Sequence, residues 1–279
     1  MKTTAIVPWF GAKRKMAHHI VKELGPHSWY IEPFCGSCAV LFEKEPATME
    51  TVNDLHGDLI NLARQVRDPK TWPTLYADLQ RTLVGPALWE DSAEVIMKQP
   101  FEPTLERAAH YFTYCWQGRN GSAGSTAGQN FCMRYTSNGG SPGTRFKSTV
   151  DSIPEWAERL RAVVILNEDA FAMLERIEDK LGTVIYCDPP YLLKGQKYKH
   201  DFTVADHARL AKALSRFKDT RVVVSYYEHP ELASLYPGWA KQTIEVTKGL
   251  GQSGQRGKSG ASKAKEVLLV NQSDAQLFA

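Results

Sequence analysis

The sequence predicts an α/β fold, a doubly wound parallel sheet with helices between its strands. Three observations predict it. Residues 28–32 (Ser-Trp-Tyr-Ile-Glu) form a β-branched and aromatic run, and a small-residue turn at 33–38 follows it before a helix start near 39. Residues 51–54 then predict a second short strand that ends in an acid. Strand, glycine turn, helix, strand and acid, in that order, are typical of the first half of a nucleotide-binding sheet.

The middle of the chain predicts helices and then a long loop. From 59 to 99 the apolar residues recur at helical spacing, and 106–116 predicts one more helix. Residues 118–145 are rich in Gly, Ser, Thr and Asn. A loop of that length inside a compact domain is usually functional or mobile.

The α/β pattern resumes after residue 160. The expected elements are strands at 163–166, 183–187 and 221–225, helices from 170 to about 180 and from 206 to 217, and a final pair of strands at 242–247 and 266–271. Both ends of the chain are therefore α/β, and a mainly helical segment interrupts them. We predict one domain from 1–60 together with 161–279, and a second from 61–160.

Composition indicates an ordinary soluble protein. The chain has 279 residues, 43% hydrophobic and 23% charged, with a net charge of +3 that permits a nucleic-acid partner without requiring one. Its five cysteines are odd in number and lack a disulfide-framework spacing, which favours a reducing compartment. There is no signal pattern and no apolar run of about 18 residues. We expect a cytoplasmic protein without a membrane span.

The tetrapeptide Asp188-Pro189-Pro190-Tyr191 is the most informative motif. It follows the strand expected at 183–187, and its two prolines end that strand because neither can donate to a sheet ladder. An acid and an aromatic ring are thus held on a stiff loop at the carboxyl end of a strand, where open α/β sheets bind ligands. The combination suits a flat, hydrogen-bonding ring, although a Pro-Pro turn with a solvated acid would give the same four letters.

Acidic residues recur at the ends of the expected strands, and carboxyl ends of parallel strands line one crevice. The four positions are Glu32, Asp54, Asp169 and Asp188. An acid after the second strand is well placed to accept both ribose hydroxyls of a nucleoside, and here that acid is Asp54. The turn with Gly36 lets the backbone approach a ligand. It is not G-x-G-x-x-G, so a nucleoside without phosphates fits better than a dinucleotide.

Four segments together resemble the DNA adenine methylases, which use S-adenosylmethionine to methylate adenine N6. Residues 9–13 (Trp-Phe-Gly-Ala-Lys) are similar to the family's W-x-G-G-K cofactor segment, and residues 32–38 to its E-P-F-x-G-x-G turn. Residues 53–59 resemble its second-strand segment, and 188–191 its catalytic loop. One such motif could be coincidence, but four in the right order are specific. The resemblance implies a Rossmann-like methyltransferase sheet with an inserted, mainly helical target-recognition domain at 61–160.

The resemblance also implies roles for individual residues. The expected catalytic residues are Asp188, Pro189, Pro190 and Tyr191. The expected cofactor-binding residues are Trp9, Gly11, Lys13, Glu32, Pro33, Phe34, Gly36, Asp54, Asp169, Phe171 and Asp188. Two positions depart from the family pattern, because Ala12 and Cys38 stand where glycines are usual. A Cβ at either place could narrow the pocket, so we expect weaker cofactor binding at most.

The implied reaction needs no metal and no enzyme nucleophile. Hydrogen bonds from the adenine amine to Asp188 and the Pro189 carbonyl would aim the nitrogen lone pair at the sulfonium methyl group for direct, in-line transfer. An adenine inside a duplex cannot reach such a pocket, so it would be flipped out and stacked on Tyr191.

Double-stranded DNA is the expected partner of a monomer or homodimer. Candidate DNA-binding residues in the inserted segment are Arg119, Asn120, Arg134 and Tyr135. A basic and aromatic run after the catalytic loop adds Lys197, Tyr198 and Lys199, although such runs are more often solvated loops.

Alternatives remain at this point. Methylation of cytosine N4 uses the same amine chemistry, although those enzymes more often have Ser where this chain has Asp188. A decayed homologue that still binds DNA is a second alternative, and RNA is a less favoured substrate. Cys35 and Cys38 have metal or redox spacing, but no second pair follows and both lie in the cofactor turn. The enzyme could serve a restriction-modification pair, a phage or a regulatory role.

Overall fold

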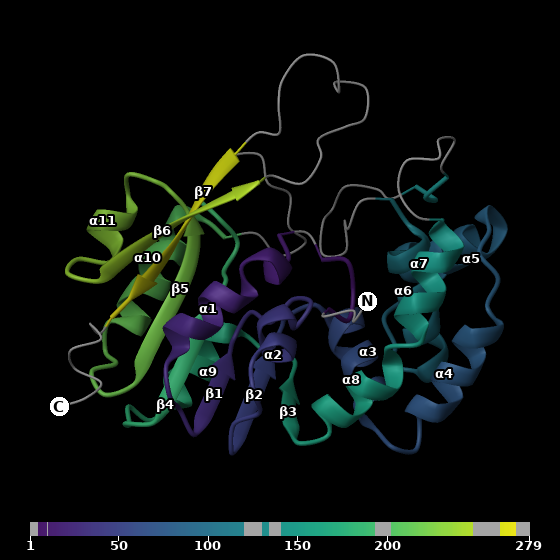
Figure 1. The fold of residues 1–279 in the computed structure, drawn as a ribbon, viewed down its shortest axis with the longest axis horizontal. Coiled ribbons are helices and arrows are strands. Elements are labelled where there is room, and N and C mark those ends of the chain that lie inside the picture. The colour runs from purple at the N-terminus through teal and green to yellow at the C-terminus, as the bar shows by residue number, and fades with distance from the viewer. Residues whose placement is uncertain are drawn as a thin grey trace, which may run out of the picture.

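A seven-stranded mixed sheet forms the body of the protein in the computed structural model (Figure 1). The structure describes residues 5–9, 11–119, 130–133, 141–192, 202–247 and 263–271. The strands are β1 (Trp29–Glu32), β2 (Met49–Asn53), β3 (Val163–Leu166), β4 (Thr183–Cys187), β5 (Arg221–Tyr227), β6 (Ala240–Thr247) and β7 (Lys263–Val270). Their order across the sheet is β3-β2-β1-β4-β5-β7-β6.

The first five strands of that order are parallel, and β7 pairs antiparallel with both β5 and β6. The chain therefore reverses its winding direction between β1 and β4, which creates a switch point where doubly wound sheets bind their ligands. This topology confirms the predicted Rossmann-like, doubly wound α/β sheet.

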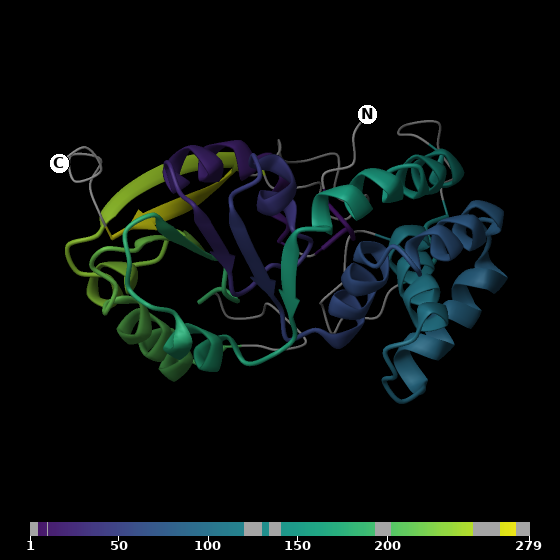
Figure 2. The same cartoon turned by 90° about the horizontal axis from the view of Figure 1, so that it is seen from below.

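Helices cover both faces of the sheet (Figure 2). They are α1 (Ala17–Leu24), α2 (Ala39–Glu43), α3 (Gly57–Arg67), α4 (Trp72–Arg81), α5 (Pro86–Lys98), α6 (Leu105–Gln117), α7 (Pro142–Val150), α8 (Ile153–Leu160), α9 (Ala170–Arg176), α10 (Val204–Leu214) and α11 (Leu232–Leu235), with a short 3-10 helix, η1 (Lys13–Lys15). Helices α1, α2 and α8 lie on one face, and α9 and α10 lie on the other.

The burial of β4 shows why its sequence is apolar throughout. Val184 and Tyr186 belong to the core beneath α1 and α2, whereas Ile185 and Cys187 belong to the core beneath α9 and α10. All four side chains are buried. A strand that is buried on both faces shows no polar alternation, which is the pattern of parallel sheets.

The described chain between β2 and β3 is helical, with one isolated bridge between Gly118 and Phe131. Helices α4 to α7 lie beyond the β3 edge of the sheet (Figure 1). A buried ion pair joins this group to the sheet side, because Arg107 Nε on α6 lies 2.6 Å from Asp58 Oδ1 on α3. The same guanidinium donates to backbone carbonyls at the end of α5, including Pro100 O at 3.0 Å. The boundaries at 61 and 160 remain predictions, since α3 and α6 share one apolar core with the sheet.

Four described helices, α1, α7, α8 and α11, lie where the sequence analysis placed no helix. Helix α1 packs on β5, and α7 begins with Pro142 inside the segment expected to be a loop. Among the described residues, no helix is long and apolar enough to cross a membrane.

Candidate active site

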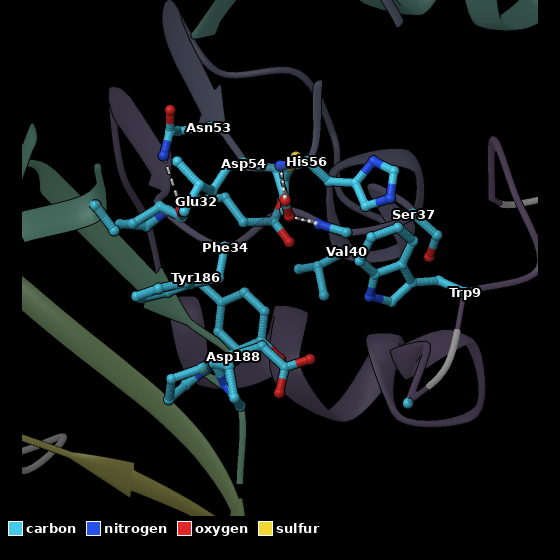
Figure 3. Close-up of a pocket in the computed structure, with 18 of the residues that line it drawn as sticks. Trp9, Glu32, Phe34, Ser37, Val40, Asn53, Asp54, His56, Tyr186 and Asp188 are labelled. Atoms are coloured by element: carbon cyan, nitrogen blue, oxygen red, sulfur yellow. Dashed lines mark hydrogen bonds between the residues drawn. The ribbon is translucent and has the colours of Figure 1, made fainter. Parts of the chain in front are cut away.

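The carboxyl ends of four adjacent strands surround one pocket (Figure 3). Its empty volume is about 970 Å³, including the space open to solvent. Glu32, Asp54, Asp169 and Asp188 all line it. The sequence prediction that these four acids meet in one crevice is therefore confirmed.

The turn after β1 forms the floor of the pocket. Gly36 has a φ of +45°, and a Cβ built on it would lie 2.9 Å from Trp9 Nε1. Glycine is thus required both by the backbone conformation and by the approach of the Trp9 ring. Cys38 has a φ of 58°, so it adopts the left-handed conformation that favours glycine.

Asp54 fixes this turn to the next strand end. Its Oδ2 accepts a hydrogen bond from Gly36 N at 2.9 Å, and its Oδ1 accepts one from His56 N at 2.9 Å. Figure 3 shows both bonds beside the Trp9 ring. The two backbone donors hold the carboxylate in one orientation at the pocket wall, and each oxygen of a carboxylate can accept further bonds from hydroxyl groups.

Asn53 was not predicted as a site residue, yet it joins three strand ends. Its Nδ2 donates to Pro33 O and to Glu168 O, both at 3.0 Å, and its Oδ1 accepts from Glu168 N at 3.0 Å. The side chain is 1% exposed. A buried amide at the end of a strand is a signal that sequence reasoning could have used, because such groups need partners.

Glu32 is the most deeply buried acid of the pocket, with 2% of its surface exposed. Among the described residues its Oε2 accepts no hydrogen bond. Burial raises the pKa of Glu32 well above its usual range, and the nearby carboxylates of Asp188 and Asp54 raise it further. A cationic ligand group placed beside this carboxyl would favour its ionised form and so lower its pKa again.

Asp188 stands at the end of β4 and is held by three donors. Its Oδ1 accepts from Ser225 Oγ at 2.8 Å and from Tyr191 OH at 3.1 Å. Its Oδ2 lies 2.8 Å from Lys13 Nζ. Ser225 is itself hydrogen-bonded to Tyr186 OH at 2.9 Å, so the carboxylate belongs to a buried network rather than to a solvated turn.

Tyr191 is less accessible than the sequence prediction requires. Its ring is 5% exposed and makes an edge contact with Tyr227 at 4.7 Å between centroids. Lys13 Nζ lies 4.8 Å from the ring centre. The pocket-lining residues of this loop are Asp188, Pro189 and Pro190.

Three phenylalanines provide aromatic surface to the pocket. The ring centres of Phe171 and Phe202 are 5.8 Å apart with the planes nearly parallel, and Phe34 meets Phe202 edge-on at 5.6 Å. Phe202 was missed because it lies in a polar stretch before α10, where one aromatic residue gives no pattern. Asp169, beside Phe171, accepts from the Phe171 and Ala172 amides and caps α9.

The expected cofactor residues converge, whereas most of the expected DNA contacts cannot be placed. All of the predicted cofactor residues line the pocket. Arg119 is exposed, and its backbone amide bonds to Asn130 O. Asn120, Arg134, Tyr135, Lys197, Tyr198 and Lys199 lie outside the described residues.

Cys35 and Cys38 are both buried free thiols. The neighbouring Cys38 and burial together raise the pKa of the Cys35 thiol well above its usual range, which disfavours the thiolate that metal binding or thiol exchange requires. Within the described ranges, no group of three or more His, Cys, Asp or Glu side chains could hold a metal ion.

Comparison with known proteins agrees with this geometry. Residues 9–248 match the family of D12 class N6 adenine-specific DNA methyltransferases. The chain is 28% identical to the Retron Ec67 DNA adenine methylase of Escherichia coli, over 96% of this chain and 91% of that protein. It is 27% identical to the type II methyltransferase M1.LlaDCHI of Lactococcus lactis subsp. cremoris, over 94% and 93%, and 25% identical to the DNA adenine methylase of Serratia marcescens, over 96% and 98%.

The match spans the four strand ends that line the pocket, and the methyl donor of such enzymes is S-adenosylmethionine. The four acids at the strand ends and the first three residues of the Asp-Pro-Pro-Tyr loop line one pocket within the matched region. This chain belongs to the D12 class of N6 adenine-specific DNA methyltransferases.

Proposed function

We propose that this protein transfers a methyl group from S-adenosylmethionine to N6 of an adenine that has been flipped out of duplex DNA, at a short specific sequence. The position of Asp188 carries this proposal. Its carboxylate lines the pocket at the end of β4 and is oriented by Ser225 and Tyr191. The family favours adenine over the cytosine N4 alternative.

The residues of the pocket fit the cofactor. Asp54 is held at the wall by two backbone amides, where its oxygens can accept ribose hydroxyls. Phe34, Phe171 and Phe202 supply aromatic surface against which an adenine ring can pack. Glu32 presents a buried carboxylate for a cationic group. When bound, the cofactor supplies an activated methyl group on a sulfonium.

The chain's own contribution is to orient the accepting amine. The lone pair of an adenine amine is conjugated with the ring, so the amine is a poor nucleophile. Asp188 and the Pro189 carbonyl would accept its two hydrogens and favour the pyramidal form. The oriented lone pair would then accept the methyl group that the bound donor supplies, with the electrons of the C–S bond left on sulfur, and Asp188 or water would take the proton that the product amine loses. Positioning and electrostatics supply the rate.

Flipping is required because the target atom is not reachable inside a duplex. Tyr191 is the expected stacking partner of the flipped base. Since the ring is 5% exposed, edge-on to Tyr227 and beneath Lys13, stacking would require the ring to become exposed as the base enters. The stacking role remains a prediction.

The test is transfer of labelled methyl groups from S-adenosylmethionine to mixed-sequence duplex DNA, followed by digestion to nucleosides. We expect label in N6-methyladenosine for the wild type and a loss of at least about 1,000-fold in rate for Asp188→Asn, which keeps the shape but weakens the acceptor. The matched control is Asp219→Asn, an exposed acid in the turn before β5, which should retain wild-type rates. Label in N4-methylcytosine, or none on DNA, would contradict the proposal.

A further inference from the structure

Three donors already hold the carboxylate of Asp188 before any substrate arrives. Ser225 and Tyr191 both donate to Asp188 Oδ1, and Lys13 Nζ lies 2.8 Å from Oδ2. The proposed function requires Asp188 to accept an amine hydrogen. Oδ2 has fewer donors than Oδ1, and its donor is Lys13. An ammonium group also withdraws electron density from that oxygen and so weakens it as an acceptor for a neutral amine.

A second acceptor for Lys13 lies close by on a different strand. Glu266 Oε2, on β7, is 3.9 Å from Lys13 Nζ. The Glu266 side chain is 10% exposed, and among the described residues its Oε2 accepts no hydrogen bond. A buried carboxylate oxygen without a donor is unfavourable. A shift of Lys13 by about 1 Å would bring the two groups to the usual charged hydrogen-bond length.

The two carboxylates of this cluster favour the protonated form of Lys13. Burial disfavours its charge, but Asp188 and Glu266 outweigh burial and raise the pKa of Lys13 above its usual value. Burial raises the pKa of Glu266; Lys13 and a hydrogen bond from Tyr191 counteract that effect, and Asp188 adds to it. The backbone of Glu266 is fixed by pairing with Tyr227 on β5 and Ile244 on β6, so the lysine is the partner that moves.

We propose that Glu266 is a positioning residue that takes the Lys13 ammonium from Asp188 when the target amine enters, so that Asp188 Oδ2 can accept the amine hydrogen. Lys13 Nζ also donates to Gly11 O at 2.9 Å, which tethers it during the exchange. The inference rests on the proposed function, because only an amine substrate requires Asp188 to change partners.

The test compares Glu266→Gln, Lys13→Gln and the double variant by single-turnover methyl transfer to duplex DNA, with S-adenosylmethionine affinity measured by calorimetry. We expect Glu266→Gln to slow transfer about 10- to 100-fold, with the cofactor dissociation constant within about threefold of the wild type. In the Lys13→Gln background the same change should cause no further loss, since Glu266 acts through Lys13. The control is Glu228→Gln, a half-exposed acid bound to Lys241, which should leave the rate unchanged.

Three outcomes would overturn the proposal. The first is a wild-type transfer rate in Glu266→Gln, and the second is a loss of cofactor affinity with the transfer rate unchanged. The third is that Glu266→Gln slows transfer equally in the wild-type and Lys13→Gln backgrounds, which indicates a merely structural role. Glu266→Asp, which keeps the charge at shorter reach, should give an intermediate rate and carries the test if the glutamine variant does not fold. If the wild-type protein methylates no adenine, both the proposed function and this inference are refuted. If the wild type is active, the variants test this inference alone.

Discussion

Replacing Gly36 with alanine tests whether the β1 turn and the Trp9 ring form the floor of the cofactor site. The new Cβ would lie 2.9 Å from Trp9 Nε1 and 3.0 Å from its Cδ1, and the backbone has a φ of +45°. The left-handed conformation costs a side chain about 1 kcal/mol. Overpacking against a ring costs about 1–3 kcal/mol more. We expect a total loss of about 2–4 kcal/mol in the free energy of unfolding.

Displacement of the Trp9 ring should also weaken cofactor binding. Trp9 lines the pocket and makes an edge contact with His56 at 5.6 Å, so the ring cannot move away from Gly36 without disturbing the wall. A loss of about 1.4 kcal/mol in binding corresponds to a tenfold rise in the dissociation constant. Calorimetry should therefore show S-adenosylmethionine binding at least about tenfold weaker.

Gly238 provides a matched control. Its φ is +79°, and nothing lies within 4 Å of the position that a Cβ would take. Gly238→Ala should lose about 1 kcal/mol of stability from the backbone alone and keep wild-type cofactor affinity. If Gly36→Ala is no less stable than Gly238→Ala and binds the cofactor equally well, the contact with Trp9 does not shape the site.

Two further changes probe buried charges, by urea unfolding and calorimetry. Asp58→Ala leaves Arg107 buried without its carboxylate, so it should lower the free energy of unfolding by about 3–5 kcal/mol; a loss below about 1 kcal/mol would contradict the structural role of the pair. In the folded protein the pKa of Glu32 lies well above its usual 4.5, so folding favours the protonated form of this side chain. The free energy of unfolding therefore falls as the pH rises from near 4.5 through the raised pKa. Glu32→Gln should therefore be more stable than the wild type at pH 8, with the difference shrinking toward pH 4.5, while cofactor binding weakens. An unchanged pH dependence would refute this.

Strands could be predicted where residues that break the apolar pattern lie at both ends of the run. The runs at 163–166 and 183–187 match β3 and β4 residue for residue, because each is apolar and bounded by polar or proline residues. The helix expected to reach about 180 ends at Arg176 instead. Asp179 accepts backbone amides from Lys218, Asp219 and Thr220, and this distant contact holds the segment outside the helix. A local pattern cannot contain that information.

The two departures from the family pattern show a similar limit. The identities of Ala12 and Cys38 suggested a changed pocket, but their conformations differ. Ala12 has a φ of −50° and a ψ of 131°, which any residue adopts without strain. Cys38 retains the left-handed backbone at a φ of 58°. Only Cys38 therefore carries a conformational cost, and its side chain is buried in the core and is not among those that line the pocket.

The environment of Asp188 explains why the acid was predictable and its partners were not. The acid is marked locally by the two prolines that follow it. Ser225, by contrast, belongs to an apolar strand run and gives no polar signal of its own. Its hydroxyl reaches Asp188 because the register of β4 and β5 sets Cys187 opposite Val224. The residues that follow these two, Asp188 and Ser225, therefore lie next to each other. Register depends on the whole sheet, and the donors that orient the catalytic carboxylate are therefore a property of the tertiary fold.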